Sequence, residues 1–180
     1  MYISRNTNYI QLLLSQDKRT FRTSELAVLW GVQNQNTLLV TTSRLVKRGV
    51  LHRLARGLYS TVPSVKLDIF EYGCAVSGSL SYVSAETILS NIGAINQLPT
   101  KITLFGKKTK EFSLGDHDFY CRYLRSDYLI NRSGIVDNSR YSVASPGRAL
   151  SDMRHILPGK YIDNPELAKV VEGEDIYAST

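Results

Sequence analysis

The chain has 180 residues, 43% of them hydrophobic, which suits one large or two small globular domains and excludes a low-complexity chain. Residues 1–66 hold ten Lys and Arg against two Asp and Glu, a net charge of +8, whereas residues 67–180 carry −2; we therefore expect an anion-binding module joined to a near-neutral one. The apolar run from Ile10 to Leu14 is too short for a signal peptide and no segment reaches transmembrane length, so we expect a cytoplasmic protein without a membrane partner.

Two helices are predicted at the start of the chain. The first covers residues 4–16, with apolar side chains along one side and Ser4 or Asn6 as its cap. The second follows Thr23, a favourable N-cap residue, and stops at Gly31.

A third helix is predicted from about Asn36 to Arg48, just before a glycine. At 100° per residue, Leu38, Leu45 and Val46 fall on one side of this helix. The other side carries mostly polar and cationic residues, namely Asn36, Thr37, Val40, Arg44, Lys47 and Arg48. The helix is therefore amphipathic, with a cationic outer face.

Two short strands are predicted next, at residues 50–54 and 57–61, with Arg56 and Gly57 at their turn. Three helices followed by a hairpin form the pattern of a winged helix-turn-helix, which we expect over residues 1–63. Such a helix fits the major groove, and a basic hairpin can contact flanking phosphates or the minor groove. The predicted DNA-binding residues are Gln35, Asn36, Thr37, Val40, Thr41, Arg44, Lys47, Arg48, Arg53 and Arg56.

The alternative is that these cations only solvate the surface of an ordinary small domain. Five of them lie within thirteen residues with no acidic residue nearby. This clustering favours a nucleic-acid interface.

The remaining sequence predicts a linker at residues 63–68 and a small mixed domain over residues 67–180, so the whole chain is expected to be α+β. The helix that starts at residue 84 has Ser84 as its expected cap. Helices are predicted at residues 67–77, 84–94, 146–157 and, weakly, within 165–180, and strands at residues 101–106, 111–115, 118–124, 128–135 and 141–145.

Three stretches, in this order, resemble the AbiEi-like antitoxins of type IV toxin-antitoxin and phage-resistance (abortive infection) systems. They are SRLVKRGVLHRLARGLY at residues 43–59, YVSAETIL at 82–89 and YSVASPGRALSDM at 141–153. The resemblance implies a repressor whose first domain binds double-stranded DNA, at repeats in its own promoter. It also implies that the second domain counteracts a nucleotidyltransferase-like toxin without forming a stable complex. A regulator of repeats usually needs two aligned copies, so we also expect self-association on DNA, with the second domain as the better candidate for supplying it.

Arg148 and Asp152 are the candidate residues of the antitoxin domain, because they lie in the third of these stretches. They are also four residues apart on one predicted helix, so an ordinary i, i+4 ion pair is the alternative interpretation. A stand-alone regulator without a toxin is the alternative to the antitoxin role.

An enzyme is the first rival to a binding module. Asp116, His117 and Asp118 offer metal ligands for phosphodiester chemistry, but in a strand His117 would point away from the two carboxylates. A polar turn between strands explains them better, because no third carboxylate or lysine follows at a nuclease-like spacing. Likewise, three lysines at positions 107, 108 and 110 fit a basic hairpin turn rather than a phosphate-binding loop.

Cys74 and Cys121 have no CxxC spacing, so we expect both to be reduced and buried rather than metal ligands together with His117. We predict no catalytic centre, no metal site and no cofactor. A nuclease-like enzyme and a protein-interaction adaptor with incidental basic charge stay open as alternatives.

Overall fold

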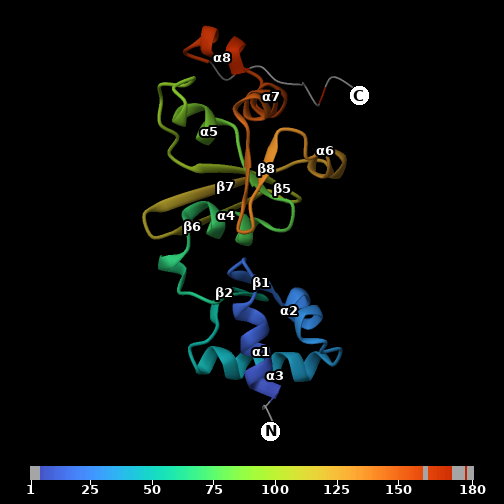
Figure 1. Cartoon of the computed structure of the whole chain (residues 1–180). Helices are drawn as coiled ribbons and strands as arrows, with labels where there is room; N and C mark the ends of the chain where they lie inside the picture. Colours follow the sequence, from blue (N-terminus) through green and yellow to red (C-terminus); the bar gives the residue numbers. More distant parts are fainter. Residues whose placement is uncertain (1–4, 160–161, 172–176, 178–180) are drawn as a thin grey trace. The chain divides into compact units, whose positions relative to one another are not determined.

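Figure 1 shows a computed structural model of the chain, which describes residues 5–159, 162–171 and 177. The protein is α+β, as predicted, and divides into two compact units, Met1–Val76 and Ser77–Thr180. Residues 64–76, which follow the predicted first domain, group with the first unit. Within the described residues, no helix has both the length and the apolar character needed to cross a membrane.

The first unit contains helices and one small sheet. Its elements are α1 (Arg5–Leu14), β1 (Thr20–Arg22), α2 (Thr23–Trp30), α3 (Gln35–Lys47), β2 (His52–Ala55), β3 (Leu58–Ser60), the 3-10 turn η1 (Ser64–Lys66) and α4 (Ile69–Ser77). The antiparallel sheet has the order β1-β3-β2, and β1 was not predicted. It is only three residues long, so its strand conformation comes from pairing with β3 rather than from a local pattern.

An apolar cluster joins the helices and the sheet of the first unit. Trp30 stacks on Tyr9 with ring centroids 5.1 Å apart, and its indole Nε1 donates to the Tyr9 carbonyl oxygen at 3.3 Å. The predicted inward side of α3 is confirmed, because Leu38 and Leu45 are both buried. The buried residues of the cluster are Leu13, Phe21, Leu26, Trp30, Leu38, Leu45, Leu51 and Tyr59.

Thr23 has a different role from the predicted one. It is the first residue of α2 and not its cap; Arg22 precedes the helix, and the Arg22 amide donates to Glu25 Oε2 at 2.6 Å. The amide and hydroxyl of Thr23 both donate to the Gly57 carbonyl oxygen, at 2.9 and 3.2 Å. Thr23 therefore ties the β2–β3 turn, where Gly57 has a φ of +71°, to the start of α2.

Helix α3 follows its prediction closely. It begins one residue earlier than expected, after Asn34, whose side-chain oxygen accepts a hydrogen bond from the Thr37 amide at 3.0 Å. Beyond its end, the amides of Val50 and Leu51 both donate to the Leu45 carbonyl oxygen, at 3.0 and 3.2 Å. The chain therefore passes directly from α3 into β2.

Two arginines before α2 bind the segment that follows the sheet. Arg22 donates to the Ala75 carbonyl oxygen at 2.7 Å. Arg19 Nε lies 3.7 Å from a carboxylate oxygen of Glu71, whose side chain is fully buried. These interactions explain why α4 belongs to the first unit.

The second unit is built on a six-stranded mixed sheet. Its elements are β4 (Tyr82–Val83), α5 (Glu86–Asn91), β5 (Ile102–Gly106), β6 (Lys110–Leu114), β7 (His117–Tyr123), α6 (Ser126–Ile130), β8 (Ile135–Asp137), β9 (Ser142–Ala144), α7 (Pro146–Ile156) and α8 (Pro165–Val171). The strand order is β6-β7-β5-β4-β9-β8, with β5 parallel to β7 and β4 parallel to β9. Helices α5, α7 and α8 lie together beside the sheet (Figure 1).

The structure corrects the prediction of a strand at residues 128–135. Tyr128 and Leu129 are buried in helix α6, and a turn through Gly134 precedes β8. The apolar residues of α6 lie before this turn and those of β8 lie after it. In the sequence the two groups together resemble a single strand. The lysines after β5 do not form a hairpin turn either, because β7 lies between β5 and β6 in the sheet.

The structure also differs from the prediction before α5. Ser84 does not cap α5, which begins at Glu86, and β4 just before it was not predicted. The last predicted helix is observed as α8, while most of the sequence after it, and Ser4 at the start of the chain, lies outside the described residues.

The guanidinium of Arg148 is the polar centre of the second unit. Its side chain is 1% exposed, and its five N–H donors all have acceptors. Nε donates to Asp152 Oδ1 (2.8 Å), one terminal nitrogen to the carbonyl oxygens of Asn131 (3.0 Å) and Ser133 (2.9 Å), and the other to the Tyr82 hydroxyl (2.7 Å) and the Tyr128 carbonyl oxygen (3.3 Å).

The partner carboxylate of Asp152 is fully buried and accepts two more hydrogen bonds. Ser84 Oγ donates to it at 2.7 Å and the Tyr177 hydroxyl at 2.5 Å. Burial, followed by the negative charge of Asp152, raises the pKa of both Tyr82 and Tyr177. Both phenols therefore stay protonated at neutral pH and remain hydrogen-bond donors.

Gly134 provides a test of how tightly this centre is packed. Its φ is +68°, and a Cβ added to it would lie 2.8 Å from Arg148 Cβ, whereas a Cβ on Gly93, with φ +76°, would meet nothing within 4 Å. We expect Gly93→Ala to cost about 1 kcal/mol from backbone strain alone. Gly134→Ala should cost about 3 kcal/mol because the steric overlap is added.

Denaturant unfolding of the full chain measures both values. If both variants lost the same free energy of unfolding, the structure around Gly134 and Arg148 would accommodate the added methyl group without further loss of stability.

Candidate nucleic-acid interface

The two units differ in charge. Counted over the sequence, Met1–Val76 holds ten Lys and Arg against four Asp and Glu, a net charge of +6. Ser77–Thr180 holds twelve of each and is neutral. A polyanion would therefore be attracted to the first unit.

Most cations of the first unit fall into two groups, and exposed Lys66, in η1, lies outside both. Lys18, Arg19 and Arg22 have partners inside the unit; Lys18 Nζ, for example, is 2.5 Å from Glu25 Oε1. The second group consists of the cations on α3 and on the β2–β3 hairpin. All of them are exposed, and within the described part of the chain none has a carboxylate oxygen within 4 Å. These five residues, which we name the basic set, are Arg44, Lys47, Arg48, Arg53 and Arg56.

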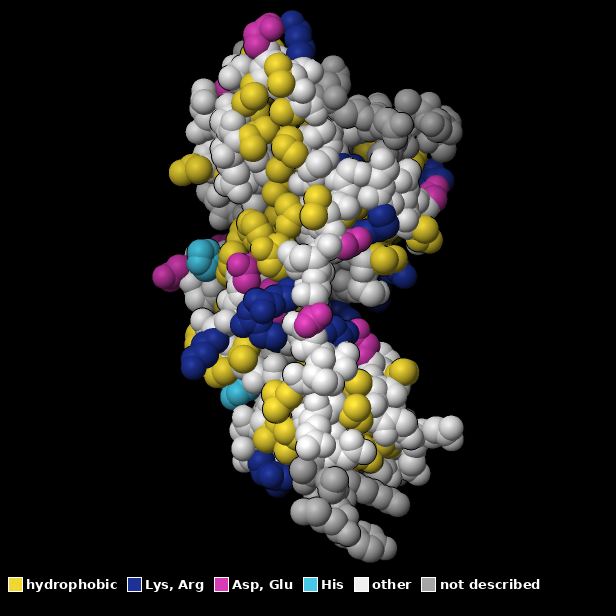
Figure 2. Space-filling view, in the orientation of Figure 1, with side chains coloured by type: hydrophobic (Ala, Val, Ile, Leu, Met, Phe, Trp, Pro, Cys, Tyr) yellow, Lys and Arg dark blue, Asp and Glu magenta, His cyan; other side chains and the backbone are white. Residues whose placement is uncertain are grey.

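Most of the residues predicted to contact DNA on α3 are exposed. They comprise Gln35, Asn36, Thr37, Val40, Arg44 and Lys47 within the helix and Arg48 at its C-cap. In Figure 2 one small patch of Lys and Arg side chains (dark blue) is visible low on the first unit, near α3, with no Asp or Glu (magenta) next to it. The exposed face of the helix is thus mostly polar and basic.

Thr41 is the exception and is removed from the predicted interface. Only 8% of it is exposed. At 100° per residue it lies next to Leu45 and Leu38, so it faces the core rather than solvent.

Leu39 was missed by the sequence analysis. It is 47% exposed, close to the 48% of Val40, and lies on the outer face of α3. The same helical projection that placed Asn36 and Val40 outside could have found it.

The β2–β3 turn carries the remaining two members of the basic set. Arg53 is exposed on β2, opposite Tyr59, and Arg56 is exposed in the turn. The register of the hairpin shifts between Arg53 and Ala55. Because Thr23 holds the Gly57 carbonyl oxygen, the backbone next to Arg56 is fixed by α2.

The candidate residues of the second unit do not form an exposed site. Arg148 and Asp152 are 2% and 0% exposed and make the i, i+4 ion pair that was the alternative interpretation. Their groups are saturated by the surrounding structure, so neither is available to a partner.

The candidate metal ligands Asp116, His117 and Asp118 are exposed and follow one another along the chain at the start of β7. Asp116 lies in the turn before β7, His117 begins β7, and Asp118 accepts a hydrogen bond from Ser113 Oγ at 2.6 Å. No group of three His, Cys, Asp or Glu able to hold a metal occurs among the residues that the structure describes. Cys74 and Cys121 are buried and free of disulfides, as predicted.

Comparisons with known proteins do not identify a family. No protein-family model matches the chain, and no curated protein matches it. The crystal structure of the RV2827C protein from Mycobacterium tuberculosis is similar, with a TM-score of 0.44 and 10% sequence identity, over 84% of this chain and 61% of that one. The chain therefore spans less than two thirds of that protein, and a likeness at this level assigns no function.

The two groups of cations are expected to differ in their contribution to stability. Arg56→Ala should change the free energy of unfolding by less than about 0.5 kcal/mol, because the side chain is exposed and unpaired. Arg22→Ala should cost about 1.5 kcal/mol, because it removes the hydrogen bond to the Ala75 carbonyl oxygen.

Thermal and denaturant unfolding compare the two variants, which remove the same charge. A loss of stability in Arg56→Ala as large as in Arg22→Ala would make Arg56 a structural residue.

Proposed function

We propose that the chain is a sequence-specific DNA-binding transcriptional regulator and that its first unit is a winged helix-turn-helix. One observation carries this proposal: the five cations of the basic set are exposed, unpaired within the described residues and confined to α3 and the hairpin that follows it. Cations that serve folding have partners, as Arg19 and Arg22 do. Cations left without partners on one helix and its hairpin fit a polyanionic ligand.

In this proposal α3 lies in the major groove. Its 13 residues make a helix about 20 Å long, and its first turns present amide, hydroxyl and apolar groups to base edges. Asn36 can pair with adenine, and exposed Leu39 and Val40 can contact thymine methyl groups. We place Arg44, on the same outer face as Asn36 and Val40, against guanine, while Lys47 and Arg48 at the end of the helix contact phosphates.

The β2–β3 turn then contacts the flanking backbone or the minor groove. Arg56 is the residue that reaches it, because it lies in a tight turn with a long, exposed side chain. Arg53, on β2, adds a phosphate contact.

The antitoxin role rests on the three sequence stretches that resemble AbiEi-like proteins, and it stays a hypothesis. In it, the regulator represses its own operon at promoter repeats and opposes a nucleotidyltransferase-like toxin. Because Arg148 and Asp152 are buried, exposed residues of the second unit would have to carry the antitoxic effect. Growth of cells expressing the chain beside the toxin tests this; growth arrest despite full expression would contradict it.

DNA binding should depend steeply on salt. Each phosphate neutralised on duplex DNA contributes about 0.9 to the slope of log K against log salt concentration, and we expect at least about four contacts, hence a slope steeper than about −3.5. A fluorescence titration over a range of salt concentrations measures this. A slope near zero would instead favour a protein-interaction adaptor with incidental charge.

Arg44 and Lys47 should differ in their effect on sequence preference. Arg44→Ala is expected to cost about 1 to 3 kcal/mol on the preferred site and to relax specificity there. Lys47→Ala should weaken binding to all sequences alike, because phosphates carry no sequence information.

Arg140→Ala, which removes an exposed arginine of the second unit, is the matched control and should leave binding unchanged. Competition with base-substituted sites separates these effects. Selectivity lost in Lys47→Ala but kept in Arg44→Ala would reverse the proposed orientation of α3.

A further inference from the structure

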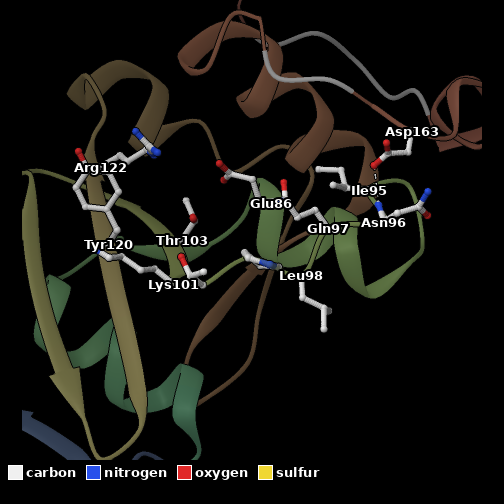
Figure 3. A pocket seen from close by; sticks show the side chains of 12 residues that line it. Glu86, Ile95, Asn96, Gln97, Leu98, Lys101, Thr103, Tyr120, Arg122 and Asp163 are labelled. Atoms are coloured by element: carbon white, nitrogen blue, oxygen red, sulfur yellow. Dashed lines mark hydrogen bonds between the residues drawn. The ribbon is translucent and has the colours of Figure 1, made fainter.

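The second unit contains a pocket that the proposed DNA interface does not use. Its volume is about 720 Å³, within the range of sites for small organic ligands. Strands β5 and β7, the start of α5, the loop between α5 and β5, and the segment before α8 line it (Figure 3).

The sheet side of the pocket is polar and aromatic. Parallel pairing sets Thr103 of β5 beside Tyr120 of β7. Side chains alternate along β7, so Phe119 and Cys121 are buried on one face while Tyr120 and Arg122 line the pocket on the other.

Arg122 is held in place but has an unsatisfied donor. Its guanidinium carbon lies 4.4 Å from the centroid of the Tyr120 ring, which fixes it by cation–π stacking. Its Nε is buried without a hydrogen-bond acceptor, and no carboxylate oxygen lies within 4 Å of the guanidinium in the described parts of the chain. A buried donor without an acceptor is unfavourable, so an anion entering the pocket would be stabilised there.

Lys101 differs from Arg122 in already having a partner. Its Nζ is 2.9 Å from Glu111 Oε2. It also lies 6.0 Å from the Tyr120 ring, so it adds positive potential at this side of the pocket. Arg122 is therefore the group available to bind an anion directly.

The opposite side of the pocket is a loop, residues 95–100, that is already fixed and carries both apolar and polar side chains. The Asn96 amide donates to Asp163 Oδ2 at 2.7 Å, and the amide of Asp163 donates back to the Ala94 carbonyl oxygen at 3.1 Å. Ile95, Leu98 and Pro99 of this loop line the pocket, and Leu98 is 79% exposed. The pocket is therefore preformed, and its apolar side chains are partly exposed to solvent.

We propose that this pocket binds a small organic anion. A single phosphate or carboxylate pairs with Arg122, and a flat or apolar body lies against Ile95, Leu98 and Pro99. The carboxylate of Glu86, on the wall between Arg122 and Gln97 (Figure 3), disfavours a polyanion and accepts from a hydroxyl or amino group of the ligand. Nucleoside 5′-monophosphates and aromatic amino acids both have this combination of groups.

Calorimetric titration of the full chain with three kinds of probe tests the proposal. The probes are nucleoside 5′-monophosphates, aromatic amino acids and inorganic phosphate. We expect one of the two organic classes to bind with a Kd below about 1 mM, and phosphate alone to bind at least tenfold more weakly. Absence of binding by both organic classes, or equal binding by phosphate, overturns the proposal.

Variants then locate the site. Arg122→Gln should weaken binding at least tenfold, while Arg140→Gln, at an exposed arginine of the same unit outside the pocket, should not. Leu98→Asp provides a second variant at an exposed position and should also weaken binding, because it adds a negative charge to the apolar wall. Equal effects of Arg122→Gln and Arg140→Gln, or no effect of Leu98→Asp, overturn the assignment.

DNA affinity is measured on the same variants and should be unchanged. A chain that binds DNA but none of the probes would contradict only this inference. A chain that binds a probe but not DNA would contradict only the proposed function.

Discussion

The second unit depends on one buried cation. The guanidinium of Arg148 joins α7 to Tyr82 of β4, to Tyr128 of α6 and to the turn before β8, through side-chain and backbone acceptors. An unpaired guanidinium in this position would be strongly unfavourable, so all these acceptors must be in place together. The ion pair with Asp152 neutralises its charge and adds Ser84 and Tyr177 to the same network. Segments far apart in the sequence are thus held together by the hydrogen bonds that one buried side chain must make.

Local patterns were sufficient to predict the first unit in outline. The helical period of α3 and the glycine in the β2–β3 turn identified both elements, since these signals lie within a few residues. Strands β1 and β4 were missed because three and two residues contain no period, and pairing with distant strands determines their conformation. In the same way, the five acceptors of Arg148 come from separate segments, so the sequence revealed only its neighbour four residues along the helix.

The candidate site was predictable in part for a related reason. Charge counting treats Arg22 and Arg56 alike, although the first binds a backbone carbonyl of α4 and the second is exposed. Only the tertiary structure separates cations that serve folding from cations that are free to bind. Thr41 and Leu39 of α3 are different, because the helical projection places Thr41 toward the core and Leu39 outside, so the sequence could have predicted the burial of both. The pocket beside Arg122 has no sequence signal, since strands and a loop assemble it.

The two hydrogen bonds from Thr23 to the Gly57 carbonyl oxygen have a consequence for recognition. A loop that must become ordered when a ligand arrives loses conformational entropy, and that loss subtracts from its affinity. Here the backbone beside Arg56 is already fastened to the first turn of α2. Only the arginine side chain is left to become ordered, so the turn is preorganised, and the contact proposed for Arg56 would be made at low entropic cost.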